Sequence, residues 1–177
     1  MHFVNAMMFI AMALSSVFQE SYSTEWNKKS TLSTHKQVEF PGIVLEPGIY
    51  IIRLKDGGEK RSIVEIRNRD ESQILATVLA VPDHQQRPDD NSEFLYFKAA
   101  GSNPTPVRTW FYSGDLIGLQ FVYPKTRAME IAKISDDHVM ASNSNRKDDL
   151  IVAVTPNGKE VVIDDPRPTQ TARQKPR

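Results

Sequence analysis

The chain has 177 residues, of which 40% are hydrophobic, and this length suits one domain with terminal extensions. Lysine and arginine total 22, as do aspartate and glutamate, so no net charge attracts nucleic acid and we expect no nucleic-acid partner. The absence of cysteine excludes disulfides, thiolate nucleophiles and metal sites with sulfur ligands.

The N-terminal segment has the pattern of an export signal. Residues 3–14 are mostly apolar, and the small residues Ser15 and Ser16 follow, as a cleavage site requires. This run is short for a bilayer span, so we expect residues 1–16 to be removed and no stable membrane span to remain. The expected location is therefore periplasmic or secreted. The alternative is a buried or interfacial helix.

Residues 17–37 are rich in serine, threonine and lysine, which predicts a linker with room for one edge strand near 31–34. The main domain is expected at 38–134, where apolar residues alternate with polar ones between turn signals. In Glu46-Pro47-Gly48 the pattern predicts a type II turn with a positive φ at the glycine. The strands are predicted at 38–44, 49–54, 62–67, 74–81, 94–97, 107–112 and 119–123.

The order of these strands predicts the fold class. The strands from 49 to 81 follow one another through short turns, as in an antiparallel meander, and the continuous apolar run at 74–81 indicates a strand covered on both faces. Residues 107–124 hold five aromatic side chains in two runs around a glycine-containing turn at 113–118, which predicts a hairpin. About seven strands at regular spacing indicate an all-β antiparallel sandwich or barrel.

After Pro124 the pattern changes to helical spacing. We expect one short amphipathic helix that buries the apolar residues Ala128, Ile131, Ala132 and Ile134, with Thr126 as its N-cap. Residues 135–177 are mostly polar and are expected to form a flexible tail. Within this tail, the apolar runs at 150–154 and 160–163 flank an Asn-Gly pair, which predicts a short hairpin.

Five motifs carry a family resemblance: VEFPG at 38–42, LEPGIY at 45–50, ILATVLAVP at 74–82, WFYSGD at 110–115 and FVYPK at 121–125. In this order and spacing the chain resembles, over roughly residues 26–132, a family of small exported bacterial proteins of unknown function. The resemblance implies an exported β-rich domain and brings no activity with it.

Three residues of the aromatic hairpin are the candidate ligand platform. Arg108, Trp110 and Tyr112 alternate along one strand, so the pattern places them on one face. If that face is open to solvent, it offers aromatic rings on which a sugar or a peptide can stack. The alternative, which we favour, is that these rings form core or rim packing, because Trp and Tyr are mostly buried.

The polar candidates lie in the loop that follows Pro82. Asp83 precedes His84 and could orient the imidazole for acid/base work or a metal bond. The oxygen-bearing residues Asp89, Asn91 and Glu93 alternate as in the opening of a calcium loop, but the glycine and the bidentate glutamate of an EF-hand are missing. Surface exposure is the default interpretation of all five.

The sequence thus assigns no catalytic residue, cofactor or metal, and no Gly-x-Ser-x-Gly motif is present. The first hypothesis is an exported non-catalytic β-sandwich protein that binds an envelope component, a polysaccharide or other extracellular polymer, or a protein partner. The alternatives are a secreted hydrolase acting on a carbohydrate or ester, and a small β-barrel holding an apolar ligand. An enzyme would place His84 or several carboxylates in one cleft, and a ligand barrel would have an apolar cavity.

Overall fold

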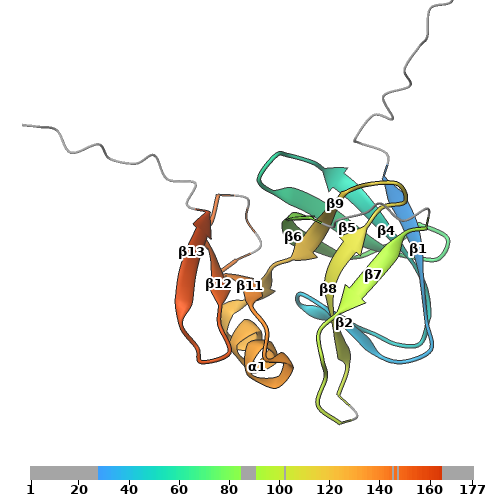
Figure 1. Ribbon diagram of the computed structural model, residues 1–177. Coiled ribbons are helices and arrows are strands. Elements are labelled where there is room, and N and C mark those ends of the chain that lie inside the picture. Colours follow the sequence, from blue (N-terminus) through green and yellow to red (C-terminus); the bar gives the residue numbers. More distant parts are fainter. Residues whose placement is uncertain (1–27, 85–90, 102, 145, 147, 165–177) are drawn as a thin grey trace, which may run out of the picture.

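The computed structural model describes residues 28–84, 91–101, 103–144, 146 and 148–164 (Figure 1). These residues form a mostly β fold with one short helix, which confirms the predicted class at that level. The expected signal peptide at 1–16 and residues 165–177 lie outside the described residues.

The described strands form two sheets. The first sheet contains β1 (Lys29–Thr34), β2 (Val38–Phe40), β3 (Ile43–Leu45), β4 (Gly48–Asp56), β5 (Ser62–Asn68), β6 (Ile74–His84), β7 (Glu93–Tyr96), β8 (Thr105–Phe111) and β9 (Ile117–Phe121). Its order is β1-β4-β5-β6-β9-β8-β2-β3, and β7 pairs with β8. The second sheet contains β10 (Tyr123–Pro124), β11 (Val139–Ser142), β12 (Ile151–Val154) and β13 (Glu160–Asp164) in that order, and α1 (Lys125–Ser135) lies between β10 and β11 in the chain.

The strand pairing agrees with the sequence pattern where strands are long. The consecutive strands β4, β5 and β6 are antiparallel, as the meander predicts, and β8 and β9 form the predicted aromatic hairpin. Two short ladders are parallel instead, between β2 and β8 and between β10 and β11. The estimate of about seven strands is not confirmed, because ladders of two or three residues leave too short an apolar pattern to detect.

The first sheet curls until its first strand comes close to β7 and β8 (Figure 1). Contact between them is made by side chains: the indole Nε1 of Trp110 donates to Ser30 Oγ at 2.9 Å, and Ser30 Oγ donates to Ser92 Oγ at 2.6 Å. These hydrogen bonds join β1 to β8 and to the residue before β7.

The main core lies inside this curl and continues under α1. The rings of Phe40 and Phe121 meet edge to face with their centroids 5.0 Å apart. The hydroxyl of the buried Tyr123 lies 2.9 Å from the carbonyl oxygen of Glu39 and 2.8 Å from that of Val107. These contacts fix β2 against β8 and against the start of the helix.

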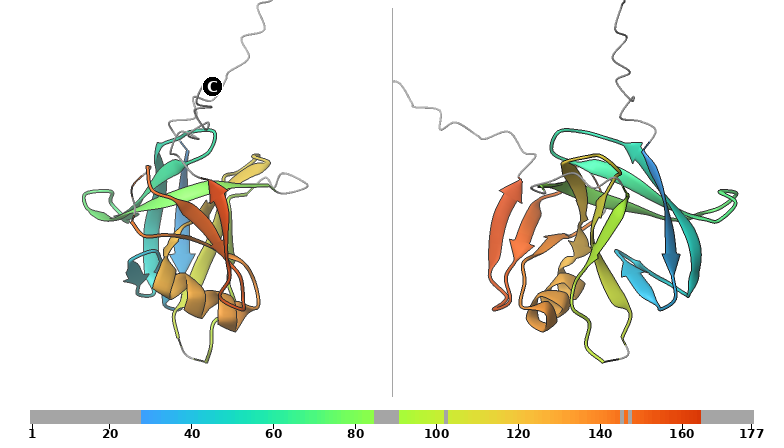
Figure 2. Two further views of the ribbon diagram at one scale, coloured as in Figure 1. Left: turned by 90° about the vertical axis from the view of Figure 1, so that its left-hand side faces the viewer. Right: turned by 45° about the vertical axis from the view of Figure 1, so that its right-hand side comes forward.

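The helix differs from the sequence prediction at its start. Pro124 occupies the N-cap position without a side-chain cap hydrogen bond, so the assignment of Thr126 as N-cap is wrong. Ala128, Ile131 and Ala132 are buried as predicted, whereas Ile134 is only partly buried. The helix lies at the opposite end of the molecule from the β4–β5 turn in both views of Figure 2. No helix in the described part of the chain is long and apolar enough to cross a membrane.

The predicted positive φ at Gly48 is also wrong. Gly48 begins β4, and the left-handed residue is Gly42, whose φ of +80° turns the chain between β2 and β3. Instead, the ring of Tyr50 packs against Gly48, and an added Cβ atom there would lie 3.3 Å from this ring. Of these two glycines, Gly48 lets the Tyr50 ring pack closely against the backbone, and Gly42 makes the tight turn.

Three of the four strands of the second sheet, β11 to β13, occupy residues that the sequence placed in a flexible tail. The predicted hairpin is present as β12 and β13, with a φ of +79° at Gly158, and β11 joins it. All four residues of β12 are buried. Leu79 and Val81 of β6 share a buried cluster with Ile151 of β12, so β6 is covered on both faces over 78–81. The prediction of a covered strand is wrong for 74–77, where Ile74 is 44% exposed.

Candidate functional site

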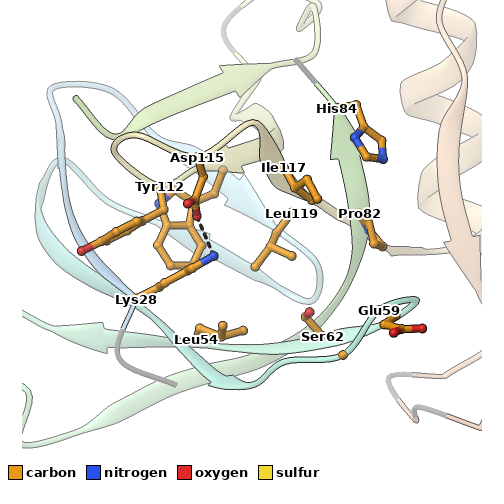
Figure 3. A pocket seen from close by; sticks show the side chains of 12 residues that line it. Lys28, Leu54, Glu59, Ser62, Pro82, His84, Tyr112, Asp115, Ile117 and Leu119 are labelled. Atoms are coloured by element: carbon orange, nitrogen blue, oxygen red, sulfur yellow. Dashed lines mark ion pairs between the residues drawn. The ribbon is translucent and has the colours of Figure 1, made fainter. Parts of the chain in front are cut away.

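A pocket of about 360 Å³ lies between the β4–β5 turn and the β8–β9 hairpin (Figure 3). Its lining surface is mostly apolar. The walls come from four strands and are formed by Leu54 of β4, Pro82 of β6, Trp110 of β8, and Leu119 of β9. Concave sites of a few hundred Å³ with apolar and aromatic walls are typical of small-molecule binding.

The pocket exists because two neighbouring strands have different lengths. Strand β5 begins at Ser62, which pairs with Ala80, whereas β6 continues to His84. In the described part of the chain, the last residues of β6 therefore pair with β9 alone. The opposite edge of β6 faces the gap, and Pro82 in this stretch has no N–H to offer a further strand.

The aromatic wall of the pocket is held in place by its neighbours. Trp110 is 1% exposed, and its indole N–H is satisfied by the buried Ser30. The ring of Phe94 stacks beside the indole at 6.5 Å, and the ring of Tyr112 meets it edge to face at 6.4 Å. Since these contacts fix the indole, the wall keeps its shape without a ligand.

An ion pair borders one side of the pocket mouth. Lys28 Nζ lies 2.6 Å from Asp115 Oδ2, and the two side chains are 25% and 30% exposed (Figure 3). The pair joins the residue before β1 to the turn between β8 and β9. Because the two charges cancel, this side of the mouth presents polar groups without a net charge.

Three further polar residues line the pocket. Ser62 is 3% exposed, whereas Glu59 and His84 are exposed to solvent. No hydrogen bond joins Ser62 to His84 among the described residues, and Figure 3 shows them on different walls. A serine nucleophile and its base must lie within hydrogen-bond reach of one another, so this arrangement does not assemble a catalytic pair.

The candidate platform does not form a shared face. Between β7 and β8, Leu95 pairs with Thr109 but Tyr96 pairs with Val107, which leaves Arg108 as an extra residue in a β-bulge. Arg108 Nη1 donates to Asp137 Oδ2 at 2.8 Å, and its guanidinium lies 5.8 Å from the ring of Phe97. Of the three platform residues, Trp110 and Tyr112 line the pocket.

The polar candidates are dispersed. Asp83 accepts a hydrogen bond of 2.8 Å from Thr109 Oγ1, a contact that ties β6 to β8. Asn91 and Glu93 are exposed near the start of β7, and Asp89 lies outside the described residues. Among the described residues no group of three His, Cys, Asp or Glu side chains could hold a metal ion. Of the polar candidates that the structure describes, only His84 reaches the pocket.

The sequence pattern did not predict that several residues line a pocket. Lys28 lay in the presumed linker, Leu54 and Leu119 had the pattern of ordinary strand residues, and Asp115 had the pattern of a turn residue. None of the four carries a local signal for binding. Their proximity depends on the curl of the sheet, which sequence periodicity does not encode.

Comparisons with known protein families, curated proteins and solved structures give no match for this chain. No residue role can therefore be transferred from a relative.

Proposed function

We propose that the protein is an exported, non-catalytic binding protein that holds a small, mostly apolar ligand in the pocket beside Trp110. The observation that carries this proposal is the apolar pocket itself, whose aromatic wall is already fixed. A preformed wall favours binding because little side-chain freedom is lost when the ligand enters. The paired charges of Lys28 and Asp115 add polar contacts for one end of the ligand.

Two other hypotheses receive less support. A platform for sugar rings needs an exposed aromatic face, but Trp110 is 1% exposed. A hydrolase needs a nucleophile beside its base, but Ser62 and His84 are not hydrogen-bonded. The geometry of the pocket therefore favours binding of a ligand without reaction over either of these two functions.

We further infer a barrel-like arrangement of the first sheet, with the pocket at its open mouth. The side-chain contacts of Ser30 with Trp110 and Ser92 support this inference, since they join the first strand to β7 and β8. Small ligands often occupy the mouths of such barrels.

The proposal that the protein is exported is based on the apolar run and the small residues within 1–16. Mass spectrometry of the protein from its native cell tests export, and an intact Met1 in a cytoplasmic fraction would contradict it.

The binding test fills the pocket with a larger side chain. We expect the apolar dye N-phenyl-1-naphthylamine to become fluorescent with the wild-type protein, and Leu119→Trp to weaken dye binding at least about tenfold, because indole would occupy the cavity. The matched control is Leu116→Trp in the turn just before β9, because Leu116 is 50% exposed and does not line the pocket. Equal binding by both variants would overturn the proposal.

A second pair of variants separates binding from catalysis. We expect His84→Ala and Ser62→Ala to retain dye affinity within about twofold, because neither supplies much apolar wall. Wild-type protein should release no product from p-nitrophenyl esters of short acids. An esterase activity that His84→Ala abolishes would favour the hydrolase instead.

A further inference from the structure

A second groove begins where the apolar pocket ends. It has a volume of about 250 Å³, and its apolar lining comes from Val81 and Pro82 of β6, Met140 of β11, and Ile163 of β13. Pro82 and Glu59 line both the apolar pocket and this second groove. The two spaces are therefore neighbours that meet across Pro82.

The strand beside the second groove exposes apolar side chains. Val161, Val162 and Ile163 are 44%, 59% and 51% exposed. Within the described residues β13 is the last strand of its sheet and pairs with β12 alone. Proteins usually protect such edges with charged residues or proline, so three consecutive exposed apolar residues indicate a surface that binds something apolar.

We propose that the ligand is a single-chain amphiphile whose alkyl chain lies in the apolar pocket, crosses Pro82 and ends in the second groove against Ile163. This proposal rests on the proposed binding function and adds the ligand class to it. Pro82 and Glu59 border both spaces, and this adjacency supports a chain longer than the pocket alone. The headgroup would lie at the opposite end, beside the neutral pair of Lys28 and Asp115.

An alkyl chain fits this path better than an extended peptide does. A peptide on the open edge of β6 would need backbone partners for its own N–H and C=O groups. Pro82 stands in that edge and has no N–H to donate. A hydrocarbon needs no hydrogen bonds, and it gains from each apolar wall that it covers.

The test is a chain-length series. Alkylphosphocholines with about eight to about sixteen carbons, each below its micelle concentration, would compete with N-phenyl-1-naphthylamine for the wild-type protein. We expect affinity to rise by about threefold per added methylene across the whole series, because the longest chains still find apolar wall beyond Pro82. An affinity that stops rising once the apolar pocket is filled would overturn the proposal.

Two neighbouring residues of β13 provide the matched variants. Ile163 lines the second groove, whereas the neighbouring Val162 is exposed and does not line it. We expect Ile163→Asn to weaken the longest chain about tenfold and leave the shortest unchanged, and Val162→Asn to change neither. Unchanged affinity for the shortest chain also shows that each variant is folded.

The outcomes separate the two proposals. Equal effects of Ile163→Asn and Val162→Asn on the longest chain, with short chains still bound, would overturn the alkyl path and leave the apolar pocket as a binding site. Failure of every chain length to displace a dye that Leu119→Trp excludes would overturn the amphiphile as the ligand and leave the binding function, whereas a dye that does not bind the wild-type protein would overturn the binding function itself.

Discussion

The two ends of the curled sheet are both aromatic, but only one of them is filled. At the closed end, which we define by Phe40, Phe97, Phe121 and Tyr123, rings interlock at centroid distances of 5.0 and 6.4 Å. At the pocket end, the ring of Trp110 packs on its neighbours and borders open space. Apolar composition alone therefore does not decide whether a sheet face becomes core or binding site.

Strand pairing and covering elements account for the difference. The closed end is covered by α1, whose Ala128 and Ile131 join the same core. At the pocket end β6 extends past the start of β5, so a gap remains beside Pro82. Aromatic rings are packed tightly at both ends, but only at the pocket end do they border an open space.

The largest expected effect tests the closed end. Phe121 is fully buried, so Phe121→Ala should lower the free energy of unfolding by about 3 to 5 kcal/mol through the cavity it leaves. Leu119, two residues earlier in β9, borders the existing pocket, so Leu119→Ala should cost about 1 kcal/mol. Urea denaturation measured by circular dichroism compares the two.

A loss of equal size for both variants would break the comparison. It would mean that the pocket wall contributes to stability as much as the closed core does. The slope of each transition also matters, because a changed slope indicates a change in the unfolded or native ensemble and not in this contact alone.

The sequence predicted the strands that alternate over many residues. The hairpin of β8 and β9 was recognised because its aromatic residues recur with period two around a glycine-containing turn, and Gly114 has a φ of +79°. The pattern failed at Arg108, where one inserted residue reverses the faces of the strand. A bulge adds a residue without changing composition, so no local signal announces it.

The pocket was harder to predict than the fold. Lys28 and Asp115 are far apart in the sequence and meet because β1 and the β8–β9 turn converge in the curled sheet. The second sheet was missed in part for a similar reason. Val139 and Ala141 of β11 are separated from β12 by a polar stretch, and packing with residues of α1 and β12 in the main core buries them.

The next prediction concerns the outer face of the β8–β9 hairpin. Side chains pack closely on this face, whereas the inner face borders the pocket. A Cβ atom at Gly118 would lie 2.5 Å from Phe111 Cε1, so Gly118→Ala should cost about 1 to 3 kcal/mol by overpacking. At Gly48 an added Cβ would lie 3.3 Å from the Tyr50 ring, so Gly48→Ala should cost less. Thermal unfolding ranks the two, and the reverse order would show that Phe111 can move aside.

A smaller effect is expected from a single hydroxyl at the closed end. Burial raises the pKa of the Tyr123 hydroxyl well above its ordinary value, so the group remains protonated and donates toward the carbonyls of Glu39 and Val107. Tyr123→Phe should cost about 1 to 2 kcal/mol, because it leaves buried carbonyls without this donor. Tyr50→Phe, which removes a hydroxyl that donates to the exposed Glu46 carbonyl, should cost under about 0.5 kcal/mol.

The smallest effect is expected at the pocket mouth. Asp115→Asn removes one charge of a partly exposed ion pair, so the free energy of unfolding should change by under about 1 kcal/mol, and by less at high salt. The matched change at the closed end is Glu39→Gln, where Arg127 donates to both carboxylate oxygens at 2.8 and 2.6 Å. Glu39 is 8% exposed, so this variant should lose about 1 to 3 kcal/mol with little salt dependence. Denaturation at low and high salt would measure both, and an equal loss from both variants would show that the pair of Lys28 and Asp115 stabilises the fold as much as the pair of Glu39 and Arg127 does.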